Sequence, residues 1–190
     1  MPISLLAGAV ALVLIGPPDS TRVTVSSPAP HPSGPVVFAP VAYMPPVAPI
    51  AVDSLVVEKG LRQLSLFYRG ELVRAYSIAL GLTPTGDKER IGDNRTPEGL
   101  FHIDARNPQS RFHLSLHISY PDDIHRARAA ALGVEPGGDI MLHGLPKGQE
   151  EAGRDHRKFD WTNGCIALTN EEIEEIWRAV PDGTPIEIKP

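Results

Sequence analysis

The stretch VDSLVVEKGLRQLSLFYRGELVRAYSIAL, residues 52–80, decides the fold class of this chain. In residues 52–58 and 63–68 the side chains follow the two-residue period of a β-strand, with Leu64, Leu66 and Tyr68 on one face of the second. Arg69-Gly70 then turns the chain into a further strand over residues 71–80. The stretch predicts one strand followed by a β-hairpin.

Strand patterns recur in the rest of the chain, and two helical patterns interrupt them. The helix over residues 122–132 begins with acids and stops at Gly133, and Thr169-Asn170-Glu171-Glu172 is a capping box that opens a second, amphipathic helix. We therefore expect a mainly β domain with two short helices. The further strands are predicted over residues 100–104, 113–120, 139–143, 166–168 and 186–188.

Length and charge limit the function classes. The chain has 190 residues, which suits one domain with a core, and it carries 18 basic against 23 acidic residues. No run of lysine or arginine is present to neutralise a phosphate backbone, so nucleic acid is not an expected partner.

The N-terminal part of the sequence differs from the rest. An apolar stretch over residues 3–15 has the length of a secretory signal, and residues 1–16 are predicted to be a signal peptide or an uncleaved membrane anchor; a buried helix is the alternative. Residues 17–50 hold many prolines and predict an extended linker, or else an arm lying on the domain. The folded domain is predicted over residues 51–190, with an exported location.

The single cysteine, Cys165, follows Gly164 and precedes the apolar run Ile166-Ala167-Leu168. A lone cysteine is either a buried small hydrophobe or a reactive thiol. Gly164 favours the thiol, because a residue without a side chain lets a substrate carbonyl approach and leaves its own N–H free for an oxyanion.

A reactive thiol needs a base, and His143 is the strongest candidate among seven histidines. It ends a predicted strand directly before Gly144, so its ring would project beside an open turn. His156 lies in a charged stretch and is expected to be a solvated loop residue, and His125, on a predicted helix, has little expected role. A zinc site formed by His143, His156 and Cys165 is the alternative chemistry, although no compact ligand pair is present.

Two polar loops are further candidates for function. The loop over residues 86–99 would frame a cleft, with Arg95 or Lys88 meeting a substrate carboxylate, or it is an ordinary exposed loop. Arg106 and Arg111 flank a second loop with the same two alternatives.

The segments Met141-Leu142-His143-Gly144 and Thr162-Asn163-Gly164-Cys165-Ile166, with Cys165 placed 22 residues after His143, resemble the signature of the YkuD-type L,D-transpeptidases. The stretch over residues 52–103, with its Gly-Asp…Thr-Pro-Glu-Gly loop, is similar to the opening of that catalytic domain. The resemblance covers about residues 52–188 and implies a YkuD-like β-sandwich or barrel-like fold.

The resemblance implies roles for individual residues. Cys165 matches the nucleophile, His143 the general base, and the N–H groups of Gly164 and Cys165 the oxyanion hole. The residues expected to bind substrate are Asn163, Gly144, Thr162 and Tyr120. For Tyr120, a place in the core is the alternative. Two positions depart from the family pattern, since Asn163 replaces a histidine and Ala167 replaces an asparagine or arginine.

The resemblance also implies a reaction. A Cys165 thiolate would attack the carbonyl between residues three and four of a peptidoglycan stem peptide, and the thioester would pass to an amine of another stem or of an envelope lipoprotein, with no cofactor. The alternative is a cysteine-dependent murein hydrolase or amidase, because the Thr-Asn-Gly-Cys-Ile-Ala combination resembles a murein hydrolase-like branch of the family. A non-catalytic wall-binding module is a third hypothesis.

Overall fold

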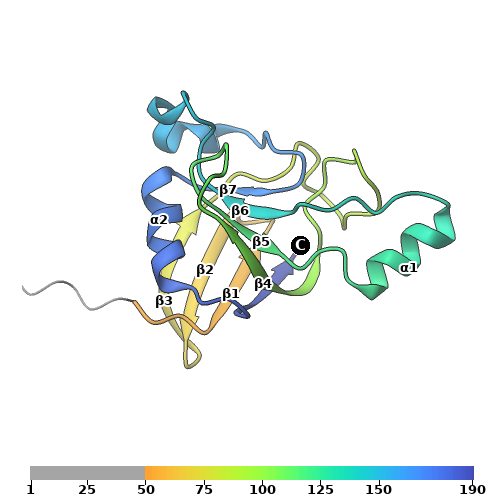
Figure 1. Ribbon diagram of the computed structural model, residues 1–190, viewed down its shortest axis with the longest axis horizontal. Helices are drawn as coiled ribbons and strands as arrows, with labels where there is room; N and C mark the ends of the chain where they lie inside the picture. The colour runs from red at the N-terminus through yellow and green to blue at the C-terminus, as the bar shows by residue number, and fades with distance from the viewer. Residues whose placement is uncertain (1–49) are drawn as a thin grey trace, which may run out of the picture. The chain divides into compact units, whose positions relative to one another are not determined.

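The computed structural model describes residues 50–190 (Figure 1). The segments predicted as signal or anchor and as linker therefore lie outside the described residues, apart from residue 50. Within residues 50–190, no helix has the length and apolar character needed to cross a membrane.

The described part is built around one sheet of eight strands, which confirms the mainly β prediction. The strand order is β3-β2-β1-β8-β4-β5-β6-β7. The strands are β1 (Ser54–Glu58), β2 (Gln63–Tyr68), β3 (Glu71–Ser77), β4 (Gly99–Asn107), β5 (Ser115–Ile118), β6 (Met141–His143), β7 (Ile166–Ala167) and β8 (Pro185–Lys189).

The opening stretch forms the predicted meander. β1 pairs with β2 and β2 pairs with β3, both antiparallel. The last strand of the chain, β8, inserts parallel to β1 and antiparallel to β4, and its Ile186 and Ile188 are buried. The N-terminal meander and the C-terminus of the chain thus share one core.

The sheet curls until its two ends meet, which gives the fold its barrel-like character. β3 and β7 are the outermost strands in the order, yet the chain just after β3 is bonded to β7. The N–H of Ala79 donates to the carbonyl of Ala167 at 3.1 Å, and the N–H of Ala167 donates back at 2.9 Å. Because this closure lies two residues beyond Cys165, it fixes the position of the cysteine turn.

The helix α2 (Asn170–Ala179) covers the apolar core beside β3 (Figure 1). Thr169 and Glu172 form the predicted capping box, and Ile173 and Ile176 are fully buried among strand residues. An ion pair of 3.0 Å between Arg74 and Glu175 adds a contact to β3. The amphipathic pattern therefore predicted both the helix and its buried face correctly.

The helix α1 (Asp123–Leu132) projects from the sheet, as Figure 1 shows, and buries only His125 and Ala129. Asp122 caps its start and Gly133 ends it with a left-handed φ of 68°, as predicted. His125 is held between Asp122, at 2.6 Å, and Asp87, at 3.1 Å. This histidine therefore ties the helix to the loop before β4.

The structure corrects two sequence predictions. A third helix, the 3-10 helix η1 (Glu150–Lys158), replaces the expected charged loop and is kinked at Gly153. The strand predicted over residues 113–120 is reduced to β5, and its start is delayed because His113 has a φ of 67° that a strand does not tolerate. Asp139, with a φ of 54°, likewise delays the start of β6.

Candidate active site

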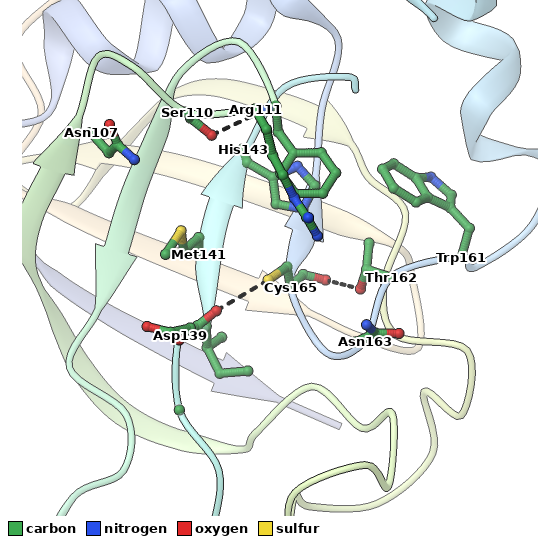
Figure 2. A pocket seen from close by; sticks show the side chains of 13 residues that line it. Asn107, Ser110, Arg111, Asp139, Met141, His143, Trp161, Thr162, Asn163 and Cys165 are labelled. Atoms are coloured by element: carbon green, nitrogen blue, oxygen red, sulfur yellow. Dashed lines mark hydrogen bonds between the residues drawn. The ribbon is translucent and has the colours of Figure 1, made fainter. Parts of the chain in front are cut away.

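A pocket of about 630 Å³ lies beside β6, between the loop that follows β4 and the turn that carries Cys165 (Figure 2). Three segments line it, within residues 107–112, 138–143 and 161–165. Cys165 and His143 are both among the lining residues. The topology thus brings the two strongest sequence candidates to one cavity, although 22 residues separate them in the chain.

The turn that carries Cys165 is fixed by Thr162. The hydroxyl of Thr162 donates to the carbonyl of Cys165 at 2.7 Å and accepts the N–H of Gly164 at 3.1 Å. The expectation that the Gly164 N–H is free is therefore not met. No acceptor within residues 50–190 bonds the N–H of Cys165 itself.

Gly164 is required by its backbone and by its surroundings. Its φ is 127°, and a Cβ at this position would lie 2.6 Å from the carbonyl oxygen of Arg95. The loop between β3 and β4 therefore packs directly behind the cysteine turn. A hydrogen bond also joins these two segments: the N–H of Leu82 donates to the carbonyl of Thr162 at 2.9 Å.

Lys88 and Arg95, the two cations considered as ligands for a substrate carboxylate, instead bond other residues of the same loop. Lys88 is buried and bonds Asp93 at 2.7 Å, and Arg95 donates to the carbonyl of Asp87 at 3.2 Å. Neither lines the pocket. Among the other two arginines considered, Arg106 bonds the carbonyl of Trp177 in α2, whereas Arg111 lines the pocket.

The Cys165 thiol is partly exposed and donates to the carbonyl of Asp139 at 3.4 Å (Figure 2). Burial raises the pKa of this thiol above its ordinary value, and a backbone hydrogen bond from Met141 only partly opposes the shift. The sulfur is therefore protonated at neutral pH and needs a base to become a nucleophile.

His143 is buried, with 2% of its surface exposed, and its ring packs against two aromatic rings that also contact each other. The centroid of Phe112 lies 4.4 Å away and that of Trp161 lies 5.7 Å away. The Nδ1 atom donates to the carbonyl of Gly144 at 2.7 Å, so in the neutral ring Nε2 carries the lone pair. Burial lowers the pKa of His143 to about 4, which keeps the ring neutral and able to accept a proton at neutral pH.

The remaining site predictions divide into two groups. Asn163, which is exposed, and Thr162, which is buried, line the pocket beside Cys165. Gly144 lies behind His143 and orients its ring, and a Cβ there would meet the side-chain oxygen of Asn170 at 2.6 Å.

Tyr120 does not belong to this site. It is 3% exposed, its hydroxyl donates to the carbonyl of Pro136 at 3.0 Å, and its ring contacts Phe101 and His125. It is absent from the lining of the Cys165 pocket and lies in the core, as the alternative interpretation of this residue expected.

His156 is buried in η1, and the expectation of a solvated loop residue is wrong. Trp161 Nε1 donates to its Nδ1 at 3.4 Å, and burial lowers the pKa of His156 to about 4. It does not line the pocket of Cys165. Among the described residues, no three His, Cys, Asp or Glu side chains are grouped as metal ligands, which removes the zinc site proposed for His143, His156 and Cys165.

Several pocket residues had no signal of their own in the sequence. Phe112 and Trp161 hold the His143 ring, and Asp139 and Met141 contact the sulfur. Trp161 stands four residues before the cysteine, but a lone aromatic residue at that distance is typical of a core as much as of a site. Their roles follow from contacts between segments that are distant in the chain.

One family model and several known proteins are similar to this chain. Residues 53–188 match the family model described as YkuD, L,D-transpeptidase catalytic domain. YafK of Escherichia coli (strain K12) is 31% identical over 129 residues, which cover 64% of this chain and 44% of YafK. YqjB of Bacillus subtilis (strain 168) is 28% identical over 136 residues, covering 70% and 68%. Both names carry L,D-transpeptidase as a provisional assignment.

Solved structures show the same fold. Pgp2 of Campylobacter jejuni, described as a helical cell shape determining protein, superposes with a TM-score of 0.55 at 25% identity and covers 72% of this chain and 47% of its own. Bd1075 of Bdellovibrio bacteriovorus gives a TM-score of 0.52 at 23% identity, covering 73% and 48%. The chain thus spans less than half the length of YafK, Pgp2 and Bd1075. The match over residues 53–188 shows that the chain belongs to the YkuD family of L,D-transpeptidase catalytic domains.

Proposed function

We propose that this protein is a peptidoglycan L,D-transpeptidase in which Cys165 is the nucleophile and His143 the general base. The observation that carries the proposal is the shared pocket, in which a protonated thiol and a neutral imidazole with a free Nε2 lone pair face one cavity. A thiol and a base in this state are the starting point of nucleophilic acyl transfer.

The first step is acylation. His143 Nε2 takes the Cys165 proton as the sulfur attacks the carbonyl between residues three and four of a stem peptide, and the C–N bond then breaks. The proton passes to the departing amine, so D-alanine leaves and a thioester remains. The unengaged N–H of Cys165 is the donor we assign to the oxyanion, in place of the N–H of Gly164.

The second step returns the enzyme to its starting state. An amine attacks the thioester, His143 takes the amine proton, and the proton returns to the departing sulfur. If the amine belongs to another stem, a cross-link forms, and if it belongs to a lipoprotein lysine, a protein becomes anchored.

Neither Cys165 nor His143 donates a hydrogen bond to the other; the thiol donates to Asp139 and Nδ1 of the ring donates to Gly144. This geometry is compatible with the mechanism, because catalytic hydrogen bonds often form only in the presence of substrate. We expect the thiol to leave the Asp139 carbonyl when a substrate enters.

Hydrolysis is the second candidate, and Asn163 is the observation that favours it. This exposed residue stands at the pocket where the family pattern has a histidine, so it cannot move a proton during amine attack. Water would then compete for the thioester, and the protein would act as a murein hydrolase or amidase.

We place the activity in the cell envelope, where peptidoglycan lies. The proposal assigns residues 1–16 to a signal peptide or anchor, residues 17–50 to a linker and residues 51–190 to the catalytic domain. The apolar and proline-rich composition of the first two segments supports it. The likeness to Pgp2, described as a helical cell shape determining protein, supports a role in wall biogenesis and cell shape.

Product analysis with purified protein tests the proposal. The 190-residue chain is incubated with tetrapeptide muropeptides, with and without an added amine acceptor, and the products are identified by mass spectrometry. Dimers or acceptor adducts support transpeptidation, and shortened monomers in both reactions support hydrolysis. No product in either, and no loss of substrate, would contradict both.

A further inference from the structure

Arg111 places a positive charge at the pocket without a carboxylate to neutralise it. Its side chain is exposed and lines the same pocket as Cys165. Within residues 50–190, no hydrogen bond or ion pair engages its guanidinium. Arg62 and Arg106, in contrast, are each paired with an aspartate. Five N–H donors of Arg111 are therefore available to a ligand.

The position of Arg111 is fixed relative to the catalytic histidine. Its guanidinium carbon lies 4.9 Å from the centroid of the Phe112 ring, which itself stacks on His143. The Arg111 carbonyl accepts the N–H of Lys147 at 3.0 Å, and the Phe112 carbonyl accepts the N–H of Gly144 at 3.1 Å. The loop that carries Arg111 is thus bonded to the segment that follows His143.

The guanidinium lies near the reacting groups. In Figure 2 the Arg111 side chain passes in front of His143 and extends toward Cys165, while Asp139 lies on the other side of the sulfur. The charge of Arg111 adds to the lowering of the pKa of His143 by burial, and it opposes the rise that burial causes in the pKa of Cys165. The pocket is therefore polarised, with a cation on the side of the base and a carboxylate opposite.

We propose that Arg111 is a specificity-determining residue that binds a carboxylate of the acyl donor by a bidentate hydrogen bond. Guanidinium matches the planar geometry of a carboxylate, and a ring beneath it holds its plane. The proposal rests on the proposed function for the identity of the donor. Two carboxylates have the required chemistry: the terminal carboxylate of residue four and a side-chain carboxylate of residue three.

Alkylation of Cys165 tests the site without any substrate turnover. Iodoacetate carries a carboxylate and iodoacetamide does not, so the ratio of their rates reports an anion site beside the sulfur and cancels changes in thiolate fraction. We expect Arg111→Gln to lower the iodoacetate-to-iodoacetamide ratio by about tenfold, the size of a charge-assisted hydrogen bond. Arg178→Gln, the same charge change on exposed α2, is the control and should leave the ratio unchanged. An unchanged ratio in Arg111→Gln would overturn the proposal.

Two further variants separate a binding site from a general field. Arg111→Lys keeps the charge but not the planar fork, so it should recover only part of the ratio. Asp139→Asn removes a charge of opposite sign from the same pocket and should change the ratio much less than Arg111→Gln. Equal and opposite changes in these two charge-removing variants would mean that net potential alone acts, and would contradict a carboxylate site.

Amidated donors identify which carboxylate is bound. Tetrapeptides with a carboxamide at residue four, or with an amide on the side chain of residue three, are compared with the parent peptide for wild type and Arg111→Gln. Amidation of the bound group should abolish the difference in kcat/KM between the two proteins. If neither amidation does so, the assignment fails. If wild type turns over none of the peptides, the proposed function fails, and the alkylation ratio still decides the carboxylate site.

Discussion

At the residue scale, burial shifts the pKa values of Cys165 and His143, the proposed nucleophile and base, in opposite directions. It raises the pKa of the Cys165 thiol and lowers the pKa of His143 to about 4, so both are neutral at neutral pH. A preformed thiolate–imidazolium pair would require the reverse shifts. In the proposed mechanism the base therefore takes the proton during attack, and His143 is expected to be necessary for acylation.

Replacement of His143 tests this necessity. We expect His143→Gln to slow acylation of Cys165 by about 10²–10⁴-fold, the usual contribution of a positioned general base. Glutamine keeps a polar side chain beside Phe112 and Trp161, so we expect the protein to stay folded, which circular dichroism would show. An acylation rate equal to that of wild type in a folded variant would mean that another group is the base.

The pH dependence of alkylation tests the state of the thiol. Because burial raises its pKa, iodoacetamide should react with Cys165 increasingly as the pH rises past the ordinary thiol value of about 8.5. Stopped samples analysed by mass spectrometry between pH 5 and 10 give the rate. A plateau reached below pH 7 would show a low-pKa thiolate and contradict the neutral pair.

At the element scale, the loop between β3 and β4 supports the cysteine turn. The carbonyl of Arg95 approaches Gly164, and the hydroxyl of Thr96 accepts the N–H of Gly81 at 3.2 Å. Lys59, buried at the end of β1, bonds the carbonyl of Thr96 at 2.9 Å and so holds the loop. The loop that the sequence suggested as the edge of a cleft therefore packs behind the turn that carries Cys165.

Substitution of Gly164 tests this support. Gly164→Ala forces a Cβ against the Arg95 carbonyl and keeps a strained φ. We therefore expect the free energy of unfolding to fall by about 1–3 kcal/mol, and Cys165 to be displaced and to react more slowly. Gly92→Ala is the matched control, since Gly92 also has a positive φ, of 78°, but nothing within 4 Å. Thermal unfolding of both variants gives the comparison. Equal losses would mean that the close approach at Gly164 contributes nothing.

Local patterns predicted what depends on local chemistry. The strand periods, the capping box at Thr169 and the stop at Gly133 could all be read from neighbouring residues. The burial of His156 could not, because it depends on tertiary packing and not on the neighbouring residues, whose charges are typical of an exposed loop. For the same reason, the contacts of Phe112 and Trp161 with the His143 ring could not be predicted.

At the scale of the whole molecule, closure of the sheet through Ala79 and Ala167 assembles the pocket from three separate segments. The folded protein also buries two histidines, His143 and His156, and their rings stay neutral at neutral pH because burial lowers their pKa. Both therefore link stability to pH.

Stability should fall as the pH decreases from about 6.5 to about 4. The pKa of each histidine is about 4 when folded and about 6.5 when unfolded, so the unfolded chain binds protons first. The full contribution is present above pH 6.5, and up to about 3 kcal/mol per histidine is lost by pH 4. Urea unfolding at pH 7 and pH 5 measures the slope, which His156→Gln should reduce by about half. A slope unchanged by that substitution would show that His156 titrates normally.

The intact mass of the protein after brief mixing with a tetrapeptide muropeptide tests the central claim, that Cys165 forms an acyl-enzyme, most directly. We predict a mass increase equal to the donor minus D-alanine, located on Cys165 by peptide mapping and absent in Cys165→Ala. Loss of D-alanine from the donor without any adduct, and undiminished in Cys165→Ala, would show that the reaction does not pass through this thiol.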